Sequence, residues 1–333
     1  MRKGERRSFH RVTALTVTLL VSSLVGWAPL AAAQEYPSRP ITLVVGFPPG
    51  GGVDIVARQL APQLEKQLNQ RVIVENRPGA TGTNAMTSVA RATPDGYTLM
   101  MGNLGMMAAK PALYPQLPFD VARDFLPVAR LVVTPLVAVV PASVPAKSLA
   151  EFVTLANAPG SAFNFGSGGT GDVNHLAGEL FKLQSGARME HVPYKGSAPA
   201  HIDLAGGRIQ LMIDGENLVH GNIRDGRTRA LAITGEKRST ALPDVPTVTE
   251  AGFPELLVHG WQGVFVPAGT PAAIVDRLSA EIGRALSDQG LSERLAQQGT
   301  SPAYADAAAF KTYIDMERAR WGDVIRKANI KVD

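Results

Sequence analysis

Short apolar runs alternate along the chain with loops rich in glycine and proline and with segments of helical period. The clearest unit begins at residues 41–45, an apolar run typical of a buried strand, and continues into a glycine-rich turn at 46–53. The apolar positions that follow are three or four residues apart, which predicts a helix that Pro62 should kink. Repetition of such units predicts an α/β fold with mainly parallel sheets flanked by helices.

The same alternation places the other elements. We expect strands at 71–75, 97–101, 163–165, 190–192, 209–214, 229–234 and 257–266, and helices at 149–157, 174–184, 271–288 and 310–329. Residues 128–140 form an apolar stretch that is too long for one ordinary strand and that contains Pro135. This stretch therefore predicts either two strands or a crossing between two lobes.

The first residues have the layout of a secretory signal peptide. Residues 1–11 hold five cations against one anion, residues 12–33 carry no charge, and the stretch ends in three alanines suited to signal peptidase. Its apolar part is shorter than the roughly 20 residues needed to cross a bilayer, so a retained anchor is the weaker interpretation. We expect the mature chain to begin at Gln34; Arg6 and Arg7 leave open whether export uses the general or the twin-arginine route.

The length of the mature chain predicts two lobes. A mature protein of about 300 residues has the size at which one core usually splits into two. We therefore expect a signal peptide at 1–33, the first part of lobe 1 at 34–138, lobe 2 at 139–258, and the return to lobe 1 with its C-terminal helices at 259–333.

Charge and cysteine content narrow the classes of function. Without the five cations and one anion of the leader, the chain holds 28 residues of each sign and is formally neutral. A neutral chain without a polybasic run gives no support for nucleic-acid binding. The chain has no cysteine, which excludes disulfides, thiolate metal sites, a thiol nucleophile and a lipidated-cysteine tether. We expect a free monomer in the periplasm that carries no cofactor.

Three turns that follow strands and lead into helices are candidate anion-binding seats: 47–54, 167–172 and 194–198. Each brings free backbone amides to the positive end of a helix dipole, and glycine lets a ligand approach the main chain. Ligands of open α/β sheets bind at this edge. One such turn alone is more simply a tight connection, but three turns spread over both predicted lobes favour a shared cleft.

Several motifs are spread over the whole mature chain. They are YPSRPI at 36–41, the turn ending in Asp54, ENRPGA at 75–80, PDGYTL at 94–99, HLAGELF at 175–181, VPYKG at 192–196, LPDVPT at 242–247, and Trp261. Together they resemble the Bug receptors, the substrate-binding proteins of tripartite tricarboxylate transporters. The resemblance implies a two-lobed periplasmic binding protein of the Venus flytrap, type II-like class. It also implies capture of a small organic acid, delivery to membrane transporter subunits, and no catalysis.

The resemblance also implies a binding site between the lobes. The first-lobe turn and the loop near Asn103 would face the two second-lobe turns and Asp214. Backbone amides would be the main donors, Phe47 and Tyr194 would be apolar or stacking walls, and both aromatic residues are equally good core residues. The ligand-binding candidates are Phe47, Gly51, Gly52, Val53, Asp54, Asn103, Ser167, Gly168, Gly169, Thr170, Asp172, Tyr194, Ala198 and Asp214.

Two positions depart from the family pattern. Val53 stands where the family commonly has threonine, and Asp172 stands where it commonly has serine. A carboxylate in a closed cleft repels an anionic ligand, and Glu216 could add to that repulsion. We therefore hypothesise that the ligand is a monocarboxylate, an aromatic or amino-bearing acid, or an uncharged analogue. Equally, Asp172 could simply cap the helix that starts near Asn174.

The sequence offers little support for a hydrolase, a zinc site or a nucleotide-binding site. Ser167, Asp172 and His175 are the residue types of a hydrolase, but no nucleophile-elbow spacing is present. His175 and Glu179 share a helical face, yet a zinc site needs a third ligand, and no metal is expected. The glycine-rich turn lacks the residues of a nucleotide-binding loop. A receptor read by a sensor kinase is the alternative to a transporter receptor, and neither this partner nor the identity of the ligand follows from the sequence.

Overall fold

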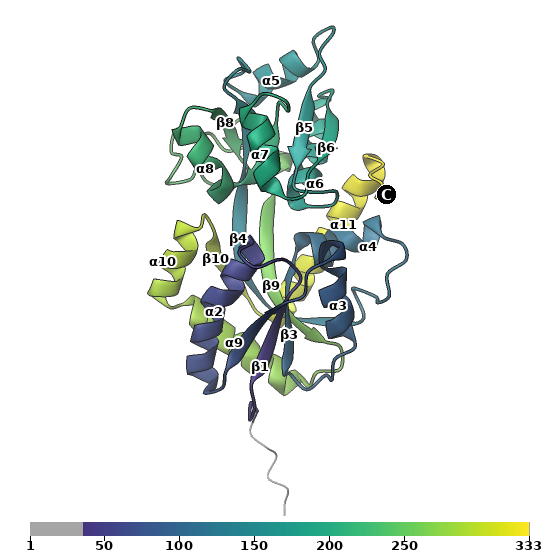
Figure 1. Ribbon diagram of the computed structural model, residues 1–333, viewed down its shortest axis with the longest axis vertical. Helices are drawn as coiled ribbons and strands as arrows, with labels where there is room; N and C mark the ends of the chain where they lie inside the picture. Colours follow the sequence, from purple (N-terminus) through teal and green to yellow (C-terminus); the bar gives the residue numbers. More distant parts are fainter. Residues whose placement is uncertain (1–35, 333) are drawn as a thin grey trace, which may run out of the picture. The chain divides into compact units, whose positions relative to one another are not determined.

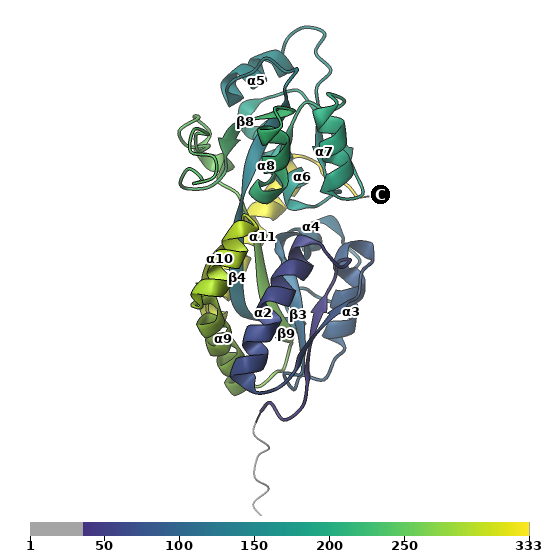
Figure 2. The same ribbon diagram turned by 60° about the vertical axis from the view of Figure 1, so that its left-hand side comes forward.

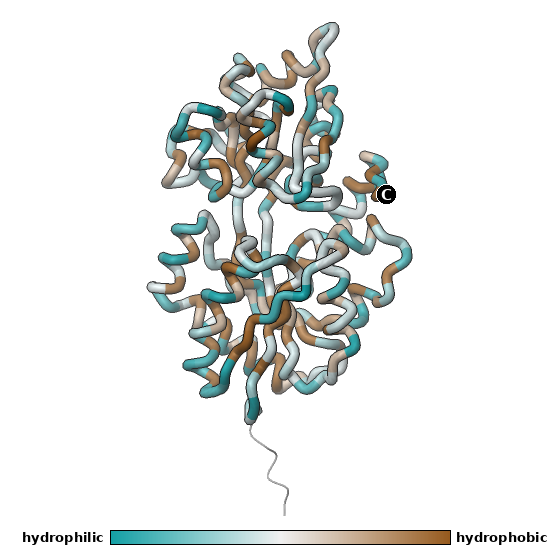
Figure 3. Tube along the Cα trace, in the orientation of Figure 1, coloured by the Kyte–Doolittle hydropathy of each residue, from teal (hydrophilic) through white to brown (hydrophobic). Residues whose placement is uncertain are grey.

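Three neighbouring parallel strands form the centre of the first lobe. The strand β1 (Ile41–Val45) lies between β2 (Val72–Asn76) and β3 (Thr98–Asn103). Four of the five β1 side chains are fully buried, as expected for a strand covered on both faces, and Figure 3 shows this segment in brown. The computed structural model describes residues 36–332, so the predicted signal peptide at 1–33 lies outside the described residues.

The long apolar stretch is a single strand that belongs to two sheets. The strand β4 (Phe125–Pro141) pairs with β9 (His259–Pro267) up to Pro135, and from Leu136 onward it pairs with β7 (Met212–Gly215) and β8 (Thr228–Ile233). Figure 1 shows β4 passing from the lower group of elements to the upper one. Proline has no N–H for a sheet ladder, and Pro135 stands where β4 changes partners. The prediction of a crossing is therefore confirmed.

The strands around β4 define two lobes. We call the elements around β1, β2, β3, β9 and β10 (Ser301–Ala305) the first lobe, with strand order β10-β4-β9-β3-β1-β2. The second lobe holds β7, β8 and the parallel pair β5 (Asn164–Ser167) and β6 (Glu190–Pro193). The predicted α/β fold class is confirmed. All pairings of β4 and β9 are antiparallel, however, so the main sheet is mixed.

Helices cover both lobes, and in the described part of the chain no helix has the length and apolar character needed to cross a membrane. The helix α2 continues through Pro62, which lies on its exposed side. The helices are α2 (Gly52–Leu68), α3 (Thr83–Ala90), α4 (Lys110–Leu113), α5 (Leu149–Ala156), α6 (Val173–Ser185), α7 (Ser197–Ala205), α8 (Glu216–Arg224), α9 (Ala272–Leu286), α10 (Gln289–Gln297) and α11 (Ala307–Lys327), with short turns η1 (Ala80–Gly82), η2 (Gly105–Ala109) and η3 (Pro254–Leu256).

One threonine ties together the two segments that cross between the lobes. The backbone amide of Leu136 donates to Thr234 Oγ1 at 2.8 Å, and the same hydroxyl donates to the carbonyl of Val258. Thr234 is fully buried, so water does not compete for these bonds. The crossing segment of β4 and the segment entering β9 are therefore held together at the point where the lobes join.

A buried carboxylate holds β9 and α11 together. The indole N–H groups of Trp261 and Trp321 each donate to Glu317 Oε2 at 3.0 Å. Both indoles are almost completely buried, and Glu317 is 7% exposed. The helix α11 packs inward through Phe310, Ile314, Trp321 and Ile325, as its apolar spacing predicts.

We predict that Glu317→Ala lowers the free energy of unfolding by about 2–4 kcal/mol, because it leaves two buried N–H donors unpaired. Glu317→Gln keeps an acceptor oxygen and should lose less than half as much. Urea denaturation of both variants measures the difference. Equal losses would show that the shared acceptor contributes little.

Candidate functional site

A cleft of about 1150 Å³ lies between the two lobes and is lined by both. Its floor contains residues of the crossing strands, including Thr134, Leu136 and Trp261. The first lobe adds the turn before α2, the loop at Asn103 and the segment 296–301. Figure 2 shows α2 in one lobe and α6, α7 and α8 in the other, and the first residues of all four helices line the cleft.

The four helices that begin at the cleft have no side-chain cap. Their N-cap residues are Gly51, Asp172, Gly196 and Gly215, and none of these residues accepts a bond from the first-turn amides through its side chain. In α6 the amide of His175 donates instead to Asn174 Oδ1. Of the helices that begin elsewhere, α5, α10 and α11 are capped by Ser148, Asp288 and Asp306, while α3, α4 and α9 also lack a side-chain cap. The first amides of a helix have no partner inside the helix. The cleft is therefore bordered by four groups of backbone donors at the positive ends of helix dipoles.

The structure places the predicted ligand-binding residues in two groups. Eight line the cleft: Phe47, Gly51, Gly52, Val53, Asn103, Asp172, Ala198 and Asp214. Six are not among the lining residues: Asp54, Ser167, Gly168, Gly169, Thr170 and Tyr194. For several of the second group, the side chain is already engaged inside the protein.

Asp54 organises the turn before α2 from beneath it. Its carboxylate accepts from the amide of Gly50 at 2.9 Å, from Asn76 at 2.8 Å and from Arg58. Burial alone would raise the pKa of Asp54, but these hydrogen bonds together outweigh burial and hold the pKa below its usual value. Asp54 thus shapes the seat formed by the backbone of Gly51 and Gly52.

Tyr194 is also engaged within the second lobe. Its hydroxyl donates to Asp203 Oδ2 at 2.8 Å, and Tyr194 is one of the partly buried residues packed against the second-lobe core. Burial is the main cause that raises the pKa of Tyr194 to about 12, and the bond to Asp203 adds to it. The hydroxyl is therefore a structural donor in this structure.

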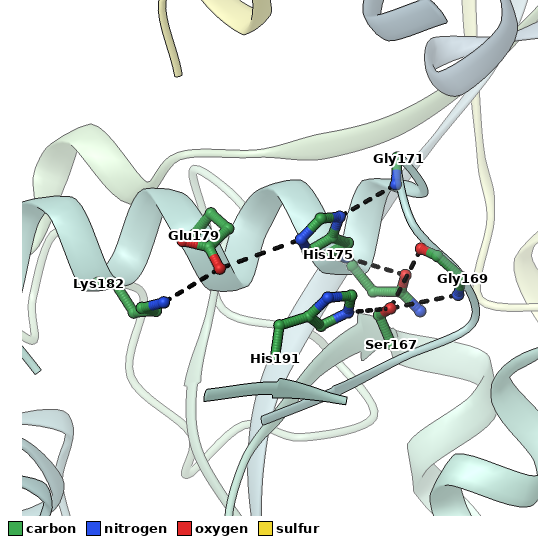
Figure 4. A network of polar contacts seen from close by, with 8 residues as sticks. Ser167, Gly169, Gly171, His175, Glu179, Lys182 and His191 are labelled. Carbon is green, nitrogen blue, oxygen red and sulfur yellow. Dashed lines mark hydrogen bonds and ion pairs between the residues drawn. The ribbon is translucent and has the colours of Figure 1, made fainter. Parts of the chain in front are cut away.

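The loop before α6 is held by a polar network around two stacked histidines (Figure 4). Ser167 Oγ lies 2.6 Å from His191 Nε2, and the amide of Gly171 donates to His175 Nδ1 at 3.0 Å. The two imidazole rings stack at 3.7 Å between centroids, and Glu179 lies 4.0 Å from His175 Nε2. Because Nδ1 of His175 accepts a bond, the proton of this neutral ring is on Nε2.

This network is structural. Ser167 is fully buried and has His191 as its partner, so it does not form the nucleophile pair with His175 that a hydrolase would need. Within the described residues, no group of three or more histidine or carboxylate side chains could hold a metal ion. No local pattern points to His191, because this residue is brought to Ser167 only by the pairing of β5 with β6.

Three carboxylates line the cleft, and two of them are paired. Asp214 Oδ1 accepts from the amide of Gly215, and its Oδ2 lies 3.0 Å from His201 Nε2. Glu216 contacts His220 and Ser239. The carboxylate of Asp172, in contrast, has no hydrogen-bond partner among residues 36–332, and it does not cap α6 although Asp172 occupies the N-cap position. The capping alternative for Asp172 is therefore wrong.

Charges around Asp172 shift its ionisation. Burial is the main cause that raises its pKa to about 6, and the negative charge of Asp214 acts in the same direction, while Lys110 opposes both. Lys110 is a buried lysine of the first lobe whose Nζ donates to Thr83 Oγ1 at 3.1 Å. Burial lowers the pKa of Lys110 to about 8. Sequence reasoning missed Lys110, and no local pattern identifies it.

Sequence reasoning named Glu216 but did not predict that a helix begins there at the cleft. Gly215 ends β7 and lines the cleft with Glu216 and Asn217, in the same strand-glycine-helix order as the three turns that were predicted. The pair Asp214 and Gly215 was the available signal. The loop 237–241 and the segment 296–301 also line the cleft, and they carry no comparable pattern.

Comparison with known proteins supports the architecture. Residues 56–330 match the model of the tripartite tricarboxylate transporter family receptor. Protein BugT of Bordetella pertussis is 37% identical over 319 residues, which covers 96% of this chain and 98% of BugT.

Solved structures agree. An R. palustris protein with adipate is 34% identical, with a TM-score of 0.80 over 89% of this chain and 99% of the other. MatC from Rhodopseudomonas palustris with bound malate is 35% identical, with a TM-score of 0.75 over 87% of this chain and 100% of MatC. A periplasmic transporter structure is 39% identical, with a TM-score of 0.79 over 90% of this chain and 100% of the other.

We predict that the stacked histidines make the ligand-free protein less stable in acid. Burial is the first cause that lowers the pKa of His175 to about 3 and of His191 to about 4. Histidines of the unfolded chain bind protons at about pH 6.5, so the unfolded state holds more protons between about pH 6.5 and pH 3. The free energy of unfolding should therefore fall as the pH falls through this range.

The variant His191→Gln removes one of these titrations, and it should give a shallower decline of the free energy of unfolding between pH 6.5 and pH 4. Denaturant titrations at several pH values measure the slope, with the region above pH 7 as the internal control. Identical slopes for the variant and the original protein would contradict the assignment.

Proposed function

Because the chain belongs to the tripartite tricarboxylate transporter family of receptors, we propose that it captures a small carboxylate-bearing molecule in the periplasm. Closure of the two lobes would hold the molecule, and the closed receptor would deliver it to the membrane subunits of a transporter of that type. The predicted leader at 1–33 supports the periplasmic location.

The observation that carries this proposal is the convergence of four uncapped helix starts on one cleft. Each start offers backbone N–H groups without a side-chain acceptor, and a carboxylate supplies two acceptor oxygens with a negative charge. The four helices come from both lobes. A ligand that bonds to both sides stabilises the arrangement in which the lobes are close.

The proposed mechanism is capture followed by closure. The turn before α2 would receive the ligand carboxylate, and the second-lobe helix starts would bind as the lobes approach. Such a ligand favours the closed state only through bonds that the open state lacks. Bending would occur where β4 changes partners at Pro135, a position that supports a lobe division near the proposed boundaries 138/139 and 258/259.

The relatives support a carboxylate ligand. One structural relative was solved with adipate and another with malate, and both are aliphatic acids. The matched family model describes a receptor, and one solved relative is a periplasmic transporter, in line with a receptor that catalyses no reaction. We propose that this chain acts as a monomer without a cofactor.

We predict that Gly52→Leu weakens the binding of small acids by at least about tenfold, because it fills the seat at the start of α2 and blocks charge-assisted bonds. A Cβ atom at Gly52 meets nothing within 4 Å, so the variant should fold normally. Gly221→Leu on α8 is the matched control, since a Cβ atom there also meets nothing and Gly221 does not line the cleft.

Isothermal titration calorimetry with adipate, malate, short monocarboxylates and short amino acids measures these affinities. Failure of every one of these acids to bind the original protein would overturn the proposed function. If the Gly52 and Gly221 variants bind these acids with equal affinity, the amides at the start of α2 are not part of the proposed binding site.

Delivery is tested separately by uptake. We predict that bacteria producing the receptor with its transporter membrane subunits accumulate the radiolabelled ligand, and that Gly52→Leu lowers the initial uptake rate while Gly221→Leu does not. Uptake that proceeds unchanged without the receptor would contradict delivery. It would leave a sensory role as the explanation of ligand binding.

A further inference from the structure

Asp172 is the one cleft carboxylate that no other residue in the described part of the chain satisfies by a hydrogen bond. Asp214 and Glu216 already have donors within the second lobe. The carboxylate of Asp172 is partly exposed, lines the cleft, and leaves the amides of α6 uncapped. A carboxylate with open acceptor positions in a cleft requires a donor from water or from the ligand.

The surroundings of this carboxylate favour a positively charged donor. The negative charge of Asp214 opposes the ionisation of Asp172, and the positive charge of Lys110 favours it. Lys110 forms no ion pair with Asp172; its Nζ donates to Thr83 Oγ1 and lies over the ring of Tyr114. Two acidic side chains thus share this side of the cleft: Asp214 is paired with His201, and Asp172 has no ion-pair partner among the described residues. This arrangement disfavours a second ligand carboxylate at Asp172.

Neutral polar side chains line the cleft next to Asp172. Ser197 Oγ accepts from Asn174 Nδ2 at 3.3 Å, and both residues line the cleft. A Cβ atom added at Gly168 would lie 3.2 Å from both Asp172 Oδ2 and Ser197 Oγ, so these oxygens flank the same glycine. An ammonium group has three donors and no acceptor, which suits such a set of oxygens.

We propose that Asp172 is the specificity-determining residue of this cleft and that it selects an amino acid whose ammonium group it binds. This inference rests on the proposed function: the ligand carboxylate would occupy the amides at the start of α2, and the ammonium group would bind Asp172 in the other lobe. A ligand with opposite charges at its two ends joins the lobes, whereas a dicarboxylate of the same length meets repulsion. With a pKa of about 6, Asp172 is mostly ionised at neutral pH.

The test compares ligands of equal length that differ in one end group. At pH 7.5, calorimetry is run with 4-aminobutyrate against succinate and with 6-aminohexanoate against adipate, and hexanoate serves as the ligand with one charged end. The original protein should bind each amino acid at least about tenfold more tightly than the matched dicarboxylate, as expected for one charge-assisted bond gained or one repulsion avoided.

The variants Asp172→Asn and Asp172→Ser should reduce this preference at least about tenfold. They should bind the amino acids more weakly and the dicarboxylates more tightly than the original protein does. Asp276→Asn on the exposed side of α9 removes the same charge away from the cleft and should leave every affinity unchanged. Thermal unfolding of the unliganded variants verifies that they fold. Two different substitutions at Asp172 guard against an effect of one new side chain.

The outcomes separate this inference from the proposed function. If dicarboxylates bind the original protein as tightly as the amino acids do, or if the Asp172 variants keep the preference, the role of Asp172 is overturned and the receptor function stands. If none of the five acids binds the original protein, the proposed function and this inference both fall.

Discussion

Backbone amides at the start of a helix need acceptors, and this requirement shapes the molecule around its cleft. At α5, α10 and α11, which begin away from the cleft, the side chains of Ser148, Asp288 and Asp306 supply the acceptor. At the cleft, four helices begin without one. The cleft must therefore hold water or a polar ligand, and the chain forgoes the roughly 1 kcal/mol that each side-chain cap would contribute. Glycine at three of the four N-caps leaves the amides open to an approaching group.

The position of the cleft follows from a second constraint, the continuity of β4. A strand that pairs with β9 on one side of Pro135 and with β7 and β8 on the other fixes both sheets to one backbone. The helix starts of each lobe then face the same space. Thr234 links the neighbouring crossing segment to β4, so the junction is a pair of hydrogen-bonded strands and not a loose linker.

Much of the fold could be predicted from local sequence patterns. The rest depends on contacts between segments that are far apart in the sequence. Apolar runs identified β1 and the crossing strand, and glycine turns identified the starts of α2, α6 and α7. The antiparallel partners of β4 and β9 lie far apart in the sequence, so no local pattern predicts a mixed sheet. For the same reason Ser167 was predicted to contact the ligand, although it is hydrogen-bonded to His191 of another strand. The separation of Asp172 from the satisfied carboxylates likewise depends on partners farther along the chain, such as His201 for Asp214 and Ser239 for Glu216.

The carboxylate shared by two indoles has an optical consequence. The chain has three tryptophans, and one of them, Trp27, lies in the predicted leader. The tryptophan fluorescence of a mature protein would then come only from Trp261 and Trp321, which are bound to the same oxygen of Glu317. Trp261 also lines the cleft floor. Emission from this coupled pair therefore reports on the junction of the lobes without an added dye.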